Sequence, residues 1–209
     1  MATNPAPAAP PASSPPTSSG APAWRDHFIV LARYGAWATA RLYEHVDRLT
    51  DDEYRRDASL FFGSVHRTLN HLLVAEHLWY PRFAEGVSNR IALDTELEAD
   101  RAALKRRLLE DGSRWGPRVM TWPEARYAGT LDYTTTKGVP ASLPFAATLA
   151  HVFNHGTHHR GQVSAALTAM GQEAPVMDLV AMLVAEQAAA AATTTASAAS
   201  VASPPAPGR

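Results

Sequence analysis

The sequence predicts an all-α protein, a four-helix bundle with a short hairpin or loop insertion before the fourth helix. Four long segments repeat apolar residues at steps of three and four, which is the period of an amphipathic helix. In the central part of the chain only residues 121–141 break that period, and the links between segments are short. Amphipathic helices joined by short links bury their apolar faces against one another, as a bundle.

The first helix is predicted from Trp24 to about Arg48. Asp26 lies in its first turn, where a carboxylate complements the helix dipole. Thr50 and Asp51 then mark a break, and the acidic run that begins there suits the first turn of a short helical piece. The apolar stripe of the first helix comprises Phe28, Leu31, Tyr34 or Gly35, Ala38, Leu42 and Val46.

The second helix is predicted from about Ser64 to Glu85. Two neighbouring stripes run along it, and His71 lies in one of them together with Ala75. Pro81 falls late in the pattern, and it is expected to kink the helix or end it early because proline lacks the backbone N–H that a helix needs.

A third helix is predicted from about Thr95 to Arg118. It is the most charged of the four, and its apolar edge is narrow. A helix of this kind packs its apolar edge on its neighbours and leaves the charged face in water. The edge is supplied by Leu97, Leu104, Leu108 and Trp115.

Residues 121–141 approach the alternation of a β-strand. Within them Tyr127, Gly129, Leu131 and Tyr133 alternate with Ala128, Thr130, Asp132 and Thr134. Gly138 and Pro140 punctuate the stretch, as turn residues do. The pattern predicts a short hairpin, or a lid over one end of the bundle.

The fourth helix is predicted from near Ser142 to Met170, with Pro144 in its first turn, where a missing N–H matters little. Gly171 is the expected stop. A short last helix is predicted over residues 177–186.

Both ends of the chain are predicted to be disordered. Residues 1–23 are a Pro/Ala/Ser-rich tail, and residues 187–209 are an Ala/Thr/Pro-rich tail. Neither stretch has the large apolar side chains that would offset the entropy lost on ordering. Residues 24–186 are therefore expected to form one domain.

Composition excludes several classes of function. Nineteen basic and twenty acidic residues give a net charge of −1 without a basic stripe, so no nucleic-acid partner is expected. The absence of cysteine excludes disulfides and thiolate metal ligands, and it fits a reducing compartment. No run of about 18 apolar residues is present and the N-terminus lacks the features of a secretory signal, so a cytoplasmic location away from membranes is expected.

The motif HVFNHGTHHRGQV, residues 151–163, carries the candidate site. His155 and His159 are four residues apart, so on a helix they lie one turn apart on one face and can grip one metal ion. His71 could reach the same ion from a facing helix. The same spacing makes His151 and His155 a competing pair, whereas His158 points about 100° away from His159.

Other interpretations of these residues stay open from spacing alone. His71 could be a core histidine bonded to a backbone carbonyl or to Glu76. Arg160 is expected to be exposed or in a salt bridge, and Gln162 to support a ligand or line a pocket. The remaining histidines (27, 45, 66 and 77) are expected in surface or packing roles.

Three stretches resemble the DinB family, with which the YfiT-type metalloenzymes are grouped: YGAWATARLYEHV, SVHRTLNHLLVAEHLWYPRF and HVFNHGTHHRGQV. The resemblance covers roughly residues 24–186. It implies an up–down–down–up bundle, a damage-inducible protein, a homodimer, and a divalent metal held by His71, His155 and His159. Zinc is the default ion, with nickel, iron and manganese as alternatives.

The resemblance does not imply one particular reaction. One hypothesis is a metal-dependent thiol S-transferase or hydrolase that acts on a low-molecular-weight thiol or a small electrophile, with Tyr34, Trp37 and Gln162 in its pocket. Mycothiol-dependent relatives often carry a carboxylate in the fourth-helix metal pair, and the two histidines here do not favour that activity. The alternatives are a non-catalytic metal-binding stress-response module and a structural bundle with core histidines.

Overall fold

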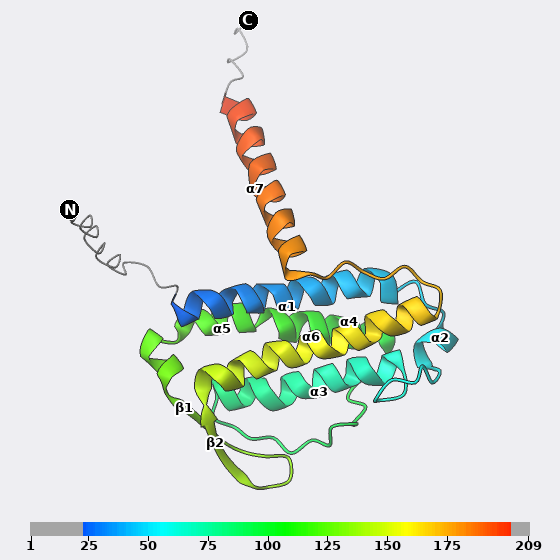
Figure 1. Ribbon diagram of the computed structural model, residues 1–209, viewed down its shortest axis with the longest axis vertical. Helices are drawn as coiled ribbons and strands as arrows, with labels where there is room; N and C mark the ends of the chain where they lie inside the picture. The colour runs from blue at the N-terminus through cyan, green and yellow to red at the C-terminus, as the bar shows by residue number, and fades with distance from the viewer. Residues whose placement is uncertain (1–22, 202–209) are drawn as a thin grey trace, which may run out of the picture.

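The computed structural model describes residues 23–201, and its four main helical rods lie side by side in one bundle (Figure 1). A small two-stranded sheet closes one end of the bundle. No helix within residues 23–201 is both long and apolar enough to cross a lipid bilayer. The elements in chain order are α1 Trp24–Val46, α2 Asp51–Arg55, α3 Val65–Ala84, α4 Arg101–Ser113, α5 Trp115–Thr121, the 3-10 helix η1 Glu124–Ala128, β1 Thr130–Thr134, β2 Pro140–Pro144, α6 Phe145–Ala169 and α7 Leu179–Val201.

The rods follow the up–down–down–up order that the family resemblance implies. In Figure 1, α1 and α6 run in one direction, whereas α3 and the α4–α5 rod run in the other. The long loop over residues 85–100 returns along the length of the bundle, and it therefore allows α4 to run parallel to α3. This arrangement places α3 and α6 side by side, and these are the helices that carry the candidate histidines.

The first two predicted helices are confirmed with small changes at their ends. Ser64 caps α3, because its hydroxyl accepts a hydrogen bond from the backbone N–H of Arg67. Thr50 and Glu53 form a reciprocal capping box at the start of the short α2. Pro81 neither ends α3 early nor stands at its end, since the helix continues to Ala84.

The third predicted helix is wrong at both ends. It begins at Arg101 because Asp100 caps it, with Oδ1 2.7 Å from the backbone N of Ala103. The loop before it is held by Asn70, whose amide both donates to the backbone carbonyl of Glu98 and accepts from its N–H, each at 2.9 Å. The rod then divides into α4 and α5.

The predicted hairpin is present. Strands β1 and β2 pair antiparallel, from Thr130 opposite Pro144 to Thr134 opposite Pro140. The second strand takes up residues that were predicted as the first turn of the fourth helix, so α6 begins at Phe145 instead of Ser142. Proline at the end of an edge strand removes no ladder hydrogen bond that the sheet needs.

Helix α7 differs most from the prediction. It begins at Leu179 and extends to Val201, well beyond the expected end at residue 186, and it projects from the bundle (Figure 1). The predicted disordered tail over 187–209 is therefore wrong for residues 187–201. This stretch is rich in alanine, which has the highest intrinsic helix propensity, so it can be helical without burying large apolar side chains. Residues 1–22 and 202–209, where the rest of the predicted tails falls, lie outside the described residues.

The buried core falls into two clusters along the bundle. One joins aliphatic residues of α1, α3, α4 and α6 near the α2 end, and it includes Leu42, Leu69 and Leu167. The other is aromatic and lies near the sheet, where Phe145 has no exposed surface and packs edge-to-face on Phe83 and Trp122. Together the clusters fix α3 against α6 on both sides of the candidate site.

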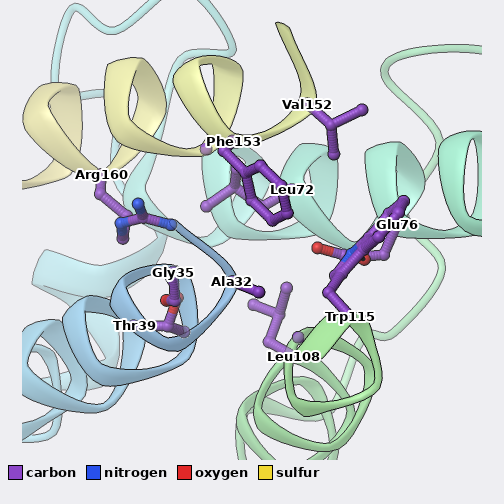
Figure 2. A pocket seen from close by; sticks show the side chains of 12 residues that line it. Ala32, Gly35, Thr39, Leu72, Glu76, Leu108, Trp115, Val152, Phe153 and Arg160 are labelled. Carbon is purple, nitrogen blue, oxygen red and sulfur yellow. Dashed lines mark hydrogen bonds between the residues drawn. The ribbon is translucent and has the colours of Figure 1, made fainter. Parts of the chain in front are cut away.

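A cavity of about 40 Å³ lies inside the bundle, with room for roughly two or three water molecules (Figure 2). Arg160 enters it from α6 and Glu76 from α3. Arg160 is only 6% exposed, and within residues 23–201 it forms no ion pair, so the expected surface or salt-bridge role is wrong. Glu76 accepts a hydrogen bond from Nε1 of Trp115 at 2.6 Å. Glu76 is only half-buried, because part of its surface faces this cavity.

Burial raises the pKa of Glu76 to about 7. Between pH 4.5 and 7 the folded state therefore binds more protons than the unfolded state, and stability falls as the pH rises. We expect Glu76→Gln to gain about 2.5 kcal/mol relative to the unsubstituted protein between pH 5 and pH 8. Urea unfolding of the metal-free protein at both pH values measures this difference. The exposed Glu44→Gln should show no such change, and equal differences for Glu76→Gln at both pH values would contradict the prediction.

Candidate metal centre

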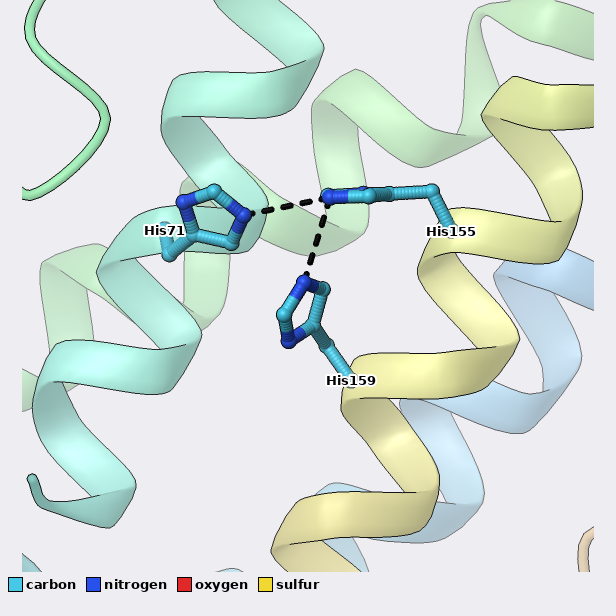
Figure 3. Close-up of side chains that lie close together, drawn as sticks. All are labelled: His71, His155 and His159. Carbon is cyan, nitrogen blue, oxygen red and sulfur yellow. Dashed lines mark hydrogen bonds between the residues drawn. The ribbon is translucent and has the colours of Figure 1, made fainter. Parts of the chain in front are cut away.

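Three histidines from two helices converge on one point. The Nε2 atom of His155 on α6 lies 3.1 Å from Nε2 of His71 on α3 and 3.1 Å from Nε2 of His159, one turn further along α6 (Figure 3). One ring nitrogen from each lies within 4.8 Å of the others. Imidazole nitrogens at about 2.0–2.1 Å from one tetrahedral ion are about 3.3 Å apart, so the spacing suits a shared metal.

Hydrogen bonds on the other ring nitrogens orient two of the three rings. Nδ1 of His71 lies 2.8 Å from the backbone carbonyl of Leu93, and Nδ1 of His159 lies 2.7 Å from Oε1 of Gln162. Both partners are acceptors, so each Nδ1 carries the proton and each Nε2 presents a lone pair to the centre. One Nε2–H of His155 can satisfy only one of these lone pairs, whereas a cation would satisfy all of them. The donor set therefore fits a divalent metal.

The same surroundings keep the imidazoles neutral. Burial, followed by the neighbouring imidazoles of His159 and His71, lowers the pKa of His155 from 6.5 to about 3. Burial also lowers the pKa of His159 to about 4, against the opposing effect of the hydrogen bond that His159 donates to Gln162, and it lowers the pKa of His71. Neutral imidazole is the form that binds a metal, so the cluster is in its ligand form at neutral pH.

The alternatives that spacing left open are now distinguishable by geometry. His71 does bond a backbone carbonyl, but through the nitrogen that faces away from the cluster. Glu76 bonds Trp115 and not His71. His151 is exposed and lies outside the group of three, as does His158, which lies 3.2 Å from the amide nitrogen of Gln162.

The other histidines lie apart from the cluster. His45 contacts the backbone carbonyl of Glu173, and the buried His66 contacts Glu96. His77 lies 3.3 Å from a carboxylate oxygen of Asp111. These are packing or surface contacts, as expected from the sequence.

An aromatic side chain that the sequence did not single out covers the cluster. Phe62, in the loop before α3, stacks on the ring of His71 with centroids 3.9 Å apart and an angle of 21° between the rings. Its ring also lies 5.7 Å from that of His159. A phenyl ring in this position displaces water from two imidazoles, and it contributes to the burial that keeps them neutral.

A pocket of about 310 Å³ opens on the cluster, and His71 and His155 form part of its wall. A volume of this size suits a small-molecule ligand. The expected pocket residues Tyr34 and Trp37 do not line it, since the Tyr34 hydroxyl donates to the backbone carbonyl of Met177 on another side of the bundle. The other lining residues are Ala75, Leu78, Trp79, Arg82, Leu93, Tyr133, Thr135, Thr136 and His151.

Part of that wall could have been found from the sequence. Ala75, Leu78, Trp79 and Arg82 follow His71 at steps of three and four, so they share its face of α3. The contribution of the hairpin had no comparable signal, because no local pattern shows that Tyr133 folds back over α3.

Comparison with known proteins shows the family and the fold. A model of the DinB family matches residues 25–192. Protein DinB of Bacillus subtilis (strain 168) is 24% identical over 164 residues, which covers 73% of this chain and 91% of that protein. Among solved structures, YfiT of Bacillus subtilis, described as a probable metal-dependent hydrolase with an unusual four-helix bundle topology, superposes with a TM-score of 0.59. That match has 17% sequence identity and covers 77% of this chain and 95% of YfiT, so it supports the fold.

Proposed function

Because the chain belongs to the DinB family, we propose that it is a metal-dependent enzyme in which His71, His155 and His159 hold a divalent ion, with zinc as the first candidate. The observation that carries the proposal is the convergence of three Nε2 atoms, two of them fixed as lone pairs by Leu93 and Gln162. An ion held by three neutral ligands keeps its full charge, leaves a coordination position for a substrate, and lowers the pKa of a water or thiol beside it.

The chain's own residues supply the remaining parts of such a site. His151 lies at the edge of the pocket, with its ring centroid 5.7 Å from that of His155, and it can accept the proton that the nucleophile gives up. The ring centroids of Trp79 and Tyr133 lie 5.5 Å apart. As part of the pocket wall, these two rings keep water from the substrate. Phe62 does not line this pocket, and its ring stacks on that of His71.

Two reaction types fit this arrangement, hydrolysis and S-transfer. The sequence has no cysteine, so a thiol nucleophile has to come from a second small molecule, whereas hydrolysis needs only water. The description of YfiT as a probable metal-dependent hydrolase makes hydrolysis the first reaction to test. In either case we propose a small electrophilic substrate, because the pocket measures only about 310 Å³.

We expect the zinc-loaded chain to turn over small activated esters or amides, or to join a low-molecular-weight thiol to an electrophile. Mass spectrometry of products from both panels, with metal-free protein as the blank, is the measurement. His151→Ala should lower kcat by about 10²-fold while zinc stays bound, because it removes only the proton acceptor. Failure of every pair to react with fully loaded protein would count against an enzyme.

The alternative is a non-catalytic metal-binding module that acts in a stress response. It predicts strong stabilisation by metal and a coordination sphere with no exchangeable position. The pocket beside His71 and His155 favours the enzyme, since a purely structural site needs no adjoining space.

We also propose that the protein works in the cytoplasm as a homodimer, as its family resemblance implies. Support for an interface comes from the projecting helix α7 and the segment before it, where Val176, Val180 and Val184 are each about 60% exposed. Apolar groups that gather on an exposed surface are typical of a contact with another chain.

A further inference from the structure

A buried arginine lies in the same pocket as the histidine cluster. The guanidinium of Arg82, on α3, packs against two adjacent aromatic rings, with its central carbon 4.7 Å from the centroid of Trp79 and 4.7 Å from that of Tyr133. Arg82 is 5% exposed. Cation–π contacts of this kind attract the charge of a guanidinium but use none of its N–H donors as hydrogen-bond partners.

The donors of Arg82 are largely unused. Its Nη2 atom donates to the backbone carbonyl of Thr134 at 3.3 Å, and its Nε atom is buried without a hydrogen-bond partner. Among residues 23–201 no carboxylate forms an ion pair with it, although several exposed arginines have one. A buried, charged donor without a partner is unfavourable unless a ligand completes it.

The surroundings of Arg82 favour an anion. None of the residues that line the pocket is acidic. Thr135 and Thr136 bring two hydroxyl groups to the same wall, and the Thr135 oxygen accepts from the backbone N–H of Val139, which leaves its own hydrogen free to donate. A guanidinium with neighbouring hydroxyl donors matches the oxygens of a carboxylate or phosphate.

We propose that the pocket binds a small molecule that carries a carboxylate or phosphate group, held by Arg82 while its reactive end lies at the histidine cluster. His71 and His155 line the same pocket as Arg82, so one ligand can reach both. The proposal rests on the proposed function for the role of the reactive end, but the oxyanion site itself depends only on residues of this chain.

The test uses the full-length, zinc-loaded protein and two hydroxamates of equal length. Glutaric acid monohydroxamate carries a terminal carboxylate, and pentanehydroxamate is its neutral counterpart. Isothermal titration is expected to show that the carboxylate form binds at least about tenfold more tightly, as charge-assisted hydrogen bonds require. Arg82→Met keeps an aliphatic stem against the rings and should abolish that preference without weakening the neutral compound.

Arg126→Met is the matched control. Arg126 also lies over an aromatic ring, with its central carbon 4.2 Å from the centroid of Phe145, and it also donates to a backbone carbonyl of the hairpin, that of Thr130. It does not line the pocket, so its substitution should leave the preference unchanged. A lower melting temperature would show that Arg82→Met loosens the hairpin, and Arg82→Lys is then the variant to compare. It keeps the charge but loses the planar fork, so it should retain only part of the preference for the carboxylate compound.

A metal-free arm separates this proposal from the function of the cluster. Glutarate titrated into metal-free protein should bind the unsubstituted chain at least about tenfold more tightly than Arg82→Met. This result would hold even if the cluster failed to bind zinc. Equal affinity for the two hydroxamates, or for glutarate with and without Arg82, would overturn the oxyanion site whether or not zinc binds.

Discussion

His155→Ala is expected to weaken zinc binding on the order of 10³-fold, because a tightly bound zinc gains several kcal/mol from each ligand that holds it. His155 is the informative position, since its Nε2 atom lies 3.1 Å from those of both His71 and His159. The variant leaves two imidazoles on different helices. Isothermal titration with zinc, on protein purified without a histidine tag, measures the loss.

Two variants on the same helix make the result specific. His158→Ala removes an exposed imidazole next to His159, and it should change zinc affinity by less than about threefold because His158 lies outside the group of three. Gln162→Leu removes the acceptor that orients His159, so an intermediate loss of about 10–100-fold is expected. If His158→Ala weakened binding as much as His155→Ala, the metal would be bound by the histidine-rich surface and not by the cluster.

The sequence predicted the parts of this site that depend on local periodicity. His155 and His159 are four residues apart in a helix, and the helical geometry alone places their rings on one face. The long amphipathic segments likewise predicted α1, α3 and α6 to within a few residues. His71 was a weaker inference from the residues, because its position opposite α6 depends on how two helices pack.

Other parts of the site depend on contacts between distant segments, which periodicity does not show. Phe62 lies on His71 because of the path of a loop, and Tyr133 lies on Arg82 because the hairpin folds back over α3. Arg82 itself has the spacing of a pocket residue, but nothing local distinguishes a buried guanidinium from an exposed one. Tyr34 shows the opposite error, since it shares the apolar stripe of α1 but faces Met177.

Zinc affinity is expected to be nearly independent of pH down to about pH 5. Protons compete with the metal only when the imidazoles of the folded protein can be protonated, and burial with the neighbouring rings lowers the pKa of His155 to about 3. Burial similarly lowers the pKa of His159 to about 4. Three imidazoles with an ordinary pKa of about 6.5 would lose roughly 10³-fold in affinity between pH 7.5 and 5.5, whereas we expect a loss of a few-fold at most.

The same pKa shifts should make the stability of the metal-free protein depend on pH. Between about pH 3 and 6.5 the unfolded chain binds protons at these histidines and the folded chain does not, so stability is lost as the pH falls. For His155 and His159 together this loss is roughly 4 kcal/mol once solvent screening of these partly exposed rings is allowed for. His155→Ala should therefore be more stable than the unsubstituted protein in metal-free urea titrations at pH 5, although it binds zinc far more weakly. A zinc affinity that falls 10³-fold by pH 5.5, together with no gain for His155→Ala, would show that the rings are ordinary exposed imidazoles.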